Sequence, residues 1–236
     1  MDLPKHDLHH VLPMPESWDA PPRGRVVCFA PHPDDECAGP GGALHKHRRQ
    51  GDPVRIVIAT DGRAGDPDGK YDPATYVERR RQESERAMAI LDCHDLEFWN
   101  LPDSCVITDA DVGGIALRVA ETVRAFDADV VYAPWEGEAN SDHRAIYCGV
   151  LRGLRQLGFR GVALGYELWG LMVPDVVLDI SNVFERKLEA MRQYETQLAY
   201  VDYLHTVTGQ NAHRSVIFNK GVGYAEAFRR IAVATD

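Results

Sequence analysis

Several side chains that can bind a metal or move a proton lie within one short segment, His32-Pro33-Asp34-Asp35-Glu36. An apolar run at residues 25–30 precedes the segment and predicts a buried strand. A glycine-rich turn and a helical stretch follow it. In open α/β sheets, ligands bind at the carboxyl ends of strands. The segment therefore predicts a divalent metal site with a neighbouring carboxylate base.

A second polar cluster, Asn140-Ser141-Asp142-His143, follows another apolar run at residues 128–133. In a doubly wound sheet of order 3-2-1-4, the first and fourth strands are neighbours, so the two clusters should meet. Two histidines and a carboxylate converging there would make an open zinc site. The alternative is that the acidic residues only complement helix N-termini and that His143 is a surface residue.

The chemistry gives two adjacent aspartates separate tasks. One carboxylate would bind the metal, while the other would stay unbound and take a proton from the metal-bound water. Adjacent side chains on an extended or turning backbone point in different directions. One aspartate can therefore face the metal while the other faces the substrate.

Alternation of strands and helices predicts an α/β fold, a Rossmann-like doubly wound, mostly parallel sheet with helices on both faces. Residues 1–24 are proline-rich without periodicity and predict an irregular arm, and 25–236 predict a single domain. The expected strands are 25–30, 54–60, 95–99, 128–133, 161–168 and 174–180. The expected helices are 40–50, 74–92, 109–126, 141–157 and 181–200, the last capped by Ser181 or Asn182.

The stretches outside these elements are also informative. Loops 61–73 and 134–140 are unusually polar, and the former is longer than a connection needs, which favours a functional flap or substrate edge. Residues from 201 onward predict a loop and then a short apolar tail. Trp99, Trp135 and Trp169 could line a site, an interface or the core.

Composition excludes several classes of protein. A net charge of −10 argues against nucleic acid or an anionic membrane as the main partner. No apolar stretch approaches the roughly 20 residues that span a bilayer, and the N-terminus lacks a signal-peptide core, so we expect a cytoplasmic protein without membrane insertion. Five scattered cysteines predict reduced thiols. A homo-oligomer is compatible with the sequence.

The motifs resemble the PIG-L/LmbE-like family of zinc-dependent N-acetylglucosaminyl deacetylases. The resemblance covers residues 25–228 and includes the two polar clusters. Its further motifs are Thr60-Asp61-Gly62, Arg80-Arg81-Gln82-Glu83, Leu101-Pro102-Asp103, Pro174–Ile180 and Tyr224–Phe228. It implies that residues 25–236 form one deacetylase domain.

The resemblance also implies roles for individual residues. Zinc would be bound by His32, Asp35 and His143, although other divalent first-row metals fit such ligands. Asp34 would be the general base and Asp142 would orient a histidine. Arg80 would contact the sugar or its phosphate-bearing substituent. Because Arg79 and Arg81 lie beside it, the choice among the three arginines stays open. The alternative is that Arg80 is only a solvated charge on a helix.

One departure from the family pattern concerns Asn140, where the family often has histidine. Asn140 can donate a hydrogen bond to an oxyanion but cannot transfer a proton. Glu138, His205 and His213 are candidates for the missing function, and Glu138 and His213 would then contact the substrate. Otherwise both histidines are ordinary polar residues of an exposed loop, and the site could even be impaired.

We therefore expect a zinc-dependent hydrolase that removes the N-acetyl group from an N-acetylglucosamine-type sugar or conjugate, with a small amino sugar as its substrate. One alternative is a related amidase acting on an amino-sugar thiol conjugate or an antibiotic intermediate. Another is a non-catalytic, metal-dependent sugar-binding protein. A nucleotide-binding Rossmann protein is a weak alternative, because no G-x-G-x-x-G follows the first strand.

Overall fold

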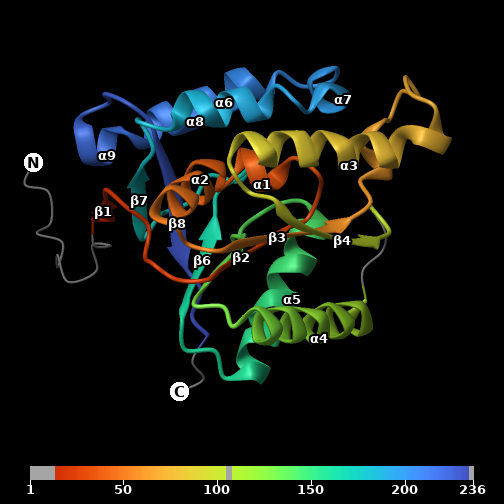
Figure 1. The fold of residues 1–236 in the computed structure, drawn as a ribbon, viewed down its shortest axis with the longest axis horizontal. Coiled ribbons are helices and arrows are strands. Elements are labelled where there is room, and N and C mark those ends of the chain that lie inside the picture. The colour runs from red at the N-terminus through yellow and green to blue at the C-terminus, as the bar shows by residue number, and fades with distance from the viewer. Residues whose placement is uncertain (1–13, 105–107, 234–236) are drawn as a thin grey trace, which may run out of the picture.

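The computed structural model describes residues 14–104 and 108–233, and its centre is an eight-stranded sheet (Figure 1). The strand order is β1-β7-β8-β6-β5-β2-β3-β4. The strands are β1 (Glu16–Trp18), β2 (Val26–Ala30), β3 (Val54–Thr60), β4 (Asp95–Leu101), β5 (Val130–Pro134), β6 (Val162–Tyr166), β7 (Val176–Asp179) and β8 (Ala225–Arg230). All pairings are parallel except those of β8, which is antiparallel to β6 and β7.

Helices cover both faces of the sheet. They are α1 (Asp35–Ala38), α2 (Gly41–Gln50), α3 (Pro73–Ile90), α4 (Asp109–Phe126), α5 (Ser141–Leu157), α6 (Phe184–Met191), α7 (Glu195–Leu198), α8 (Tyr203–Arg214) and α9 (Val216–Asn219). A 3₁₀ turn, η2, spans Arg63–Gly65. Helices α4 and α5 lie on one side, and α1, α2, α3 and α6 lie on the other (Figure 1). The predicted α/β architecture is confirmed.

The central strand β2 shows why the sheet is buried on both faces. Its alternate residues Val26, Cys28 and Ala30 belong to the core on the α2/α3/α6 side. Val27 and Phe29 belong to the core on the α4/α5 side. A continuous apolar run is therefore required, since each face of a central parallel strand contacts a layer of helices.

The predicted neighbourhood of the first and fourth core strands is also confirmed. Strand β2 pairs with β5, and β3 and β4 follow on the other side of β2. The polar segments after β2 and β5 thus leave the same edge of the sheet.

Several element predictions were wrong. Glu16–Trp18, placed in the irregular arm, pairs as a parallel edge strand with Val176–Leu178. Residues 181–200 form two helices, which are separated at residues 192–194, and Ser181 caps neither of them. Its hydroxyl instead donates to Asp179 Oδ1 at 2.6 Å and accepts from the Tyr224 backbone N–H at 3.0 Å.

The largest error concerns residues 201–228, expected to be a loop and an apolar tail. They form helices α8 and α9 and strand β8. The buried residues of α8 are Val207, Asn211 and Arg214, so two of the three positions on its inner face are polar. The sequence of this helix therefore has no apolar stripe. The two polar residues can be buried because Asn211 donates to the Ala225 carbonyl and Arg214 pairs with buried Glu167.

Among the described residues, no helix is long and apolar enough to cross a membrane.

Candidate metal centre

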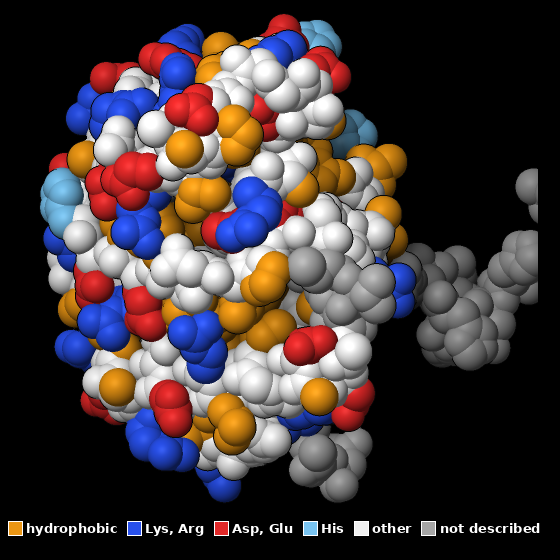
Figure 2. All heavy atoms as spheres, turned by 90° about the vertical axis from the view of Figure 1, so that its right-hand side faces the viewer, with side chains coloured by type: hydrophobic (Ala, Val, Ile, Leu, Met, Phe, Trp, Pro, Cys, Tyr) orange, Lys and Arg blue, Asp and Glu red, His pale blue; other side chains and the backbone are white. Residues whose placement is uncertain are grey.

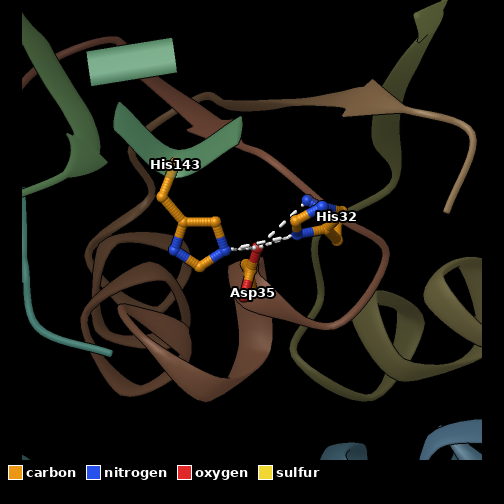
Figure 3. Close-up of side chains that lie close together, drawn as sticks. All are labelled: His32, Asp35 and His143. Atoms are coloured by element: carbon orange, nitrogen blue, oxygen red, sulfur yellow. Dashed lines mark hydrogen bonds and ion pairs between the residues drawn. The ribbon is translucent and has the colours of Figure 1, made fainter. Parts of the chain in front are cut away.

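Three potential ligand atoms converge where β2 and β5 end (Figure 3). His32 Nδ1 lies 3.2 Å from Asp35 Oδ2 and 3.2 Å from His143 Nε2. The third side, from His143 Nε2 to Asp35 Oδ2, is also 3.2 Å. In a tetrahedral zinc site with bonds of about 2.0–2.1 Å, ligand atoms lie about 3.3 Å apart. The spacing and the donor types of these three residues therefore fit zinc with one position left open.

The electrostatics of this triangle favour a cation. Burial lowers the pKa of His143, but the carboxylates of Asp35 and Glu138 together outweigh this effect and raise the pKa to about 9. Burial likewise lowers the pKa of His32, yet three neighbouring carboxylates raise it well above its usual value. Burial raises the pKa of Asp35, while the two histidines hold it far below its ordinary range. Because carboxylates dominate, the cluster is stabilised by added positive charge, from protons or from a metal.

Two carboxylates hold the far side of His32. Asp142 Oδ2 and Asp103 Oδ1 each lie 3.2 Å from His32 Nε2. Asp142 also accepts from the Ser104 backbone N–H at 2.9 Å. The expected role of Asp142 in orienting a histidine matches this contact. Asp103 was not predicted as a site residue, although it follows a strand, as His32 does, and lies in a recognised motif.

Glu138 stands behind His143 and does not line the cavity described below. Its Oε2 lies 3.4 Å from His143 Nδ1, an ion-pair distance. Its carboxylate also accepts from Trp135 Nε1 at 2.9 Å and from the backbone N–H groups of Leu168 and Gly170 at 3.2 and 3.1 Å. The structure thus places Glu138 where it can orient His143, not where it was predicted to contact substrate.

Asp34 points away from the triangle, toward Arg80. Its φ of 144° lies in a region that only glycine adopts readily, so the backbone is strained at this residue. Asp34 Oδ2 lies 3.3 Å from Arg80 Nη2, and both side chains are buried. Burial raises the pKa of Asp34 to about 8, while Arg80 acts in the opposite direction. The two adjacent aspartates therefore face different partners, as the chemistry requires.

Arg80 is distinguished from its arginine neighbours by burial. Its Nη1 donates to the Gly62 carbonyl at 2.8 Å and its Nη2 donates to the Pro33 carbonyl at 2.6 Å. Arg79 instead pairs with exposed Glu195, and Arg81 donates to exposed Asn100. A Cβ atom at Gly62 would lie 2.4 Å from Arg80 Nη1, so glycine is needed for this close approach.

Asn140 begins helix α5. Its Oδ1 accepts from the backbone N–H of Asp142 at 2.8 Å and that of His143 at 3.4 Å, the geometry of an N-cap. Since the oxygen is used in capping, the side-chain NH₂ is the group left to donate. Asn140 also lines the cavity.

A cavity of about 190 Å³ opens over the three candidate ligands. Its lining includes His32, Asp34, Asp35, Arg80, Asp103, Ser104, Asn140, His143, Trp169 and Tyr203. His205 and His213 are exposed on α8, outside this lining, so the structure does not bring either histidine to the site. Of the three tryptophans singled out, Trp99 is in the core, Trp135 bonds Glu138, and Trp169 reaches the cavity.

Figure 2 shows one face of the molecule, where side chains of both charge signs lie among scattered apolar side chains. That face carries interspersed Lys, Arg, Asp and Glu side chains and lacks a large field of one sign.

Comparisons with known proteins agree with the geometry. The family described as "PIG-L: GlcNAc-PI de-N-acetylase" matches residues 27–153. Diacetylchitobiose deacetylase of Thermococcus kodakarensis is 27% identical, over 87% of this chain and 82% of the relative. A probable N-acetyl-alpha-D-glucosaminyl L-malate deacetylase 2 of Bacillus subtilis is 30% identical, over 73% of this chain and 82% of the relative.

A solved structure shares the fold across nearly the whole chain. The 4-carboxy-2-hydroxymuconate hydratase GalB of Pseudomonas putida superposes with a TM-score of 0.74 at 20% identity, over 91% of this chain and 98% of the hydratase. At this identity the likeness concerns the fold alone, because one fold can support different reactions.

Proposed function

The chain belongs to the PIG-L family, and from this premise we propose that it is a zinc-dependent hydrolase that removes the N-acetyl group from an N-acetylglucosamine-type sugar or conjugate. One observation carries the proposal. The ligand triangle of His32, Asp35 and His143 adjoins an open cavity, and Asp34 lines that cavity without joining the triangle. A metal site with a separate carboxylate base is what hydrolysis of an amide requires.

Zinc held by the triangle would supply Lewis acidity, lowering the pKa of a bound water to about 7 and polarising the amide carbonyl. Asp34 then has two proton transfers to perform. Its carboxylate takes the proton of the attacking water and afterwards returns it to the departing amine. Burial strengthens Asp34 as a proton acceptor, while Arg80 keeps its ionised form accessible.

Asn140 would stabilise the negative charge that develops on the carbonyl oxygen. Its side-chain NH₂ is available because Oδ1 is fixed by capping α5. Preorganised donors of this kind cost no reorganisation when the charge appears. The remaining groups act through others: Arg80 positions Asp34, Glu138 positions His143, and Asp142 with Asp103 positions His32.

We further propose that the protein acts in a reducing compartment, the cytoplasm, on a small amino-sugar substrate, with neither nucleic acid nor membrane as partner. Support comes from Cys28, Cys37, Cys93 and Cys148, which are free thiols, whereas Cys105 lies outside the described residues. The net charge of −10 supports the absence of a nucleic-acid partner. Self-association remains a proposal, to be checked by light scattering.

Metal content and acetate release, measured on the same preparation, test the proposal. We expect one zinc per chain and acetate release from N-acetylglucosamine, its oligomers or a thiol-sugar conjugate. A hydratase, as the structural relative GalB is named, would release no acetate from these compounds. Absence of bound metal after zinc is supplied would refute the assignment.

A further inference from the structure

Two aromatic side chains form one wall of the cavity. Trp169 follows β6, and Tyr203 begins α8. Their rings are stacked, with centroids 5.0 Å apart and an interplanar angle of 25°. Trp169 remains 44% exposed, so one part of the indole packs on Tyr203 while much of its surface is left uncovered. A large aromatic surface left open at the edge of a polar site is an available apolar contact for a ligand.

The backbone of this wall is held by the carboxylate of Glu138, which also contacts His143. Glu138 accepts from the backbone N–H of Trp169 at 3.4 Å, besides those of its two neighbours. Gln210 Nε2 donates to the Leu168 carbonyl at 2.7 Å. Because Glu138 also contacts His143, the wall is fixed relative to the metal centre. Preorganisation of this kind lowers the entropic cost of binding.

The charges of the lining disfavour an anionic substrate portion. Apart from histidines, Arg80 is the only cation among the described residues that line the cavity. Its Nη1 and Nη2 groups already donate to two carbonyls, and Nη2 also contacts Asp34. Asp103, the lining carboxylate that is neither a proposed zinc ligand nor raised in pKa, would repel a further anion. Arg80 Nε has no hydrogen-bond partner among the described residues, but the side chain is buried, so the lining offers an anionic substituent no exposed guanidinium or ammonium group.

We infer that Trp169 and Tyr203 form a subsite for a neutral ring with an apolar face, carried by the substrate beyond its N-acetylated sugar. The inference rests on the proposed function and specifies its substrate class. The ring could be an aryl group or the apolar face of a second pyranose, and both would stack on the exposed indole.

The test compares substrates that share the N-acetylglucosamine unit and differ in the group attached to it. The zinc-loaded full chain is assayed for acetate release from four compounds. They are the methyl and phenyl glycosides of N-acetylglucosamine, N,N'-diacetylchitobiose, and N-acetylglucosamine linked to malate (the malate conjugate). We expect kcat/KM for the phenyl glycoside to exceed that for the methyl glycoside by about tenfold, which corresponds to about 1.4 kcal/mol of stacking and burial. The malate conjugate should be the poorest substrate.

Variants locate the preference. Trp169→Ala should reduce the phenyl-to-methyl ratio to within about threefold, and Trp169→Phe should retain most of it. The matched control is Leu171→Ala, in the same loop, because Leu171 is 83% exposed and outside the cavity lining. A wild-type ratio near one, preference for the malate conjugate, or an unchanged ratio in Trp169→Ala would overturn the inference. If kcat/KM exceeds that of the methyl glycoside for both N,N'-diacetylchitobiose and the phenyl glycoside, the subsite accepts rings in general. If only the phenyl glycoside shows the increase, the subsite is specific for an aryl group.

A binding measurement separates this inference from the proposed function. Titration calorimetry with phenyl and methyl glucosaminides, which lack the acetyl group, needs no turnover. Tighter binding of the phenyl compound that depends on Trp169 supports the subsite even if no acetate is released, in which case the proposed function fails alone. Acetate release with equal affinity for both compounds leaves the proposed function standing and refutes the subsite.

Discussion

Asp34 Oδ2 and Arg80 Nη2 lie 3.3 Å apart in a buried ion pair that connects the segment between β2 and α1 to the middle of α3. Arg80 is anchored independently by the carbonyls of Pro33 and Gly62. The guanidinium therefore fixes the Asp34 carboxylate outside the ligand triangle, and it opposes the rise in the Asp34 pKa caused by burial.

Removing this charge should change the pH dependence of the reaction. In Arg80→Gln, the Asp34 pKa rises further, so the base is ionised only at higher pH and the acid limb of the kcat/KM profile moves upward in pH. Misplacement of Asp34 should also lower kcat, on the order of 10²-fold. Arg81→Gln is the control, because Arg81 donates to Asn100 and does not line the cavity. A profile that superimposes on the wild type would contradict this positioning role.

Asp34→Asn tests the base itself. The substitution keeps the side-chain shape and removes proton acceptance, so we expect zinc content to stay at the wild-type level while kcat falls by about 10²–10⁴-fold. Asp68→Asn, an exposed change in the loop before α3, serves as the control. Near-wild-type turnover in Asp34→Asn would show that another group accepts the proton.

Glu138→Gln should weaken metal binding without removing a ligand. The amide oxygen can still accept backbone N–H groups, but the negative charge facing His143 Nδ1 is lost. Loss of such a partner typically costs about 10–100-fold in metal affinity. Competition with a chromophoric chelator measures the zinc Kd, and Glu136→Gln on the same loop, where Glu136 accepts from Tyr147, is the matched control. Equal zinc affinity in the two variants would argue against a positioning role for Glu138.

Asn140→Asp should separate capping from catalysis. Aspartate caps a helix as well as asparagine does, so the free energy of unfolding should change little. The N–H donor toward the oxyanion is lost, and kcat should fall by about 10²–10³-fold. Asn140→Ala should show the same kinetic defect and also lose about 1 kcal/mol of stability. Full activity in Asn140→Asp would exclude this donor from the mechanism.

The sequence was informative wherever local pattern and topology act together. Apolar runs before His32 and before Asn140 indicated parallel strands, and the doubly wound strand order 3-2-1-4 then made those strands neighbours. The ligand triangle follows from this, because both polar clusters leave the same sheet edge.

Groups that act from a distance were harder to assign. Glu138 lies near His143 in sequence, yet its role depends on the loop at residues 168–170, whose backbone it binds. In the cavity wall, Trp169 stacks on Tyr203, which begins a helix where a loop was expected. Such contacts are set by tertiary packing, which neither periodicity nor residue spacing encodes.

A buried histidine outside the site should make stability depend on pH. His47 Nδ1 lies 2.8 Å from Asp52 Oδ2, and Nε2 lies 3.0 Å from the Tyr132 hydroxyl. Burial lowers the His47 pKa below its ordinary value of 6.5, outweighing Asp52. The neutral ring suits these partners, since Nδ1–H donates to Asp52 while Nε2 accepts from Tyr132.

The sign of the effect follows from proton uptake. Between the folded and the ordinary pKa, the unfolded chain binds more protons at His47 than the folded protein does, so stability rises with pH across that window. The contribution of the neutral His47 ring to the free energy of unfolding is complete above about pH 6.5, and it is lost as the pH falls toward the pKa of His47 in the folded protein. Urea unfolding of the wild type and of His47→Gln is measured from pH 7.5 to 5.0. The difference between their free energies of unfolding gives the pH-dependent contribution of His47. The wild type should lose more stability on acidification than the variant, and equal losses would mean that His47 titrates alike in both states.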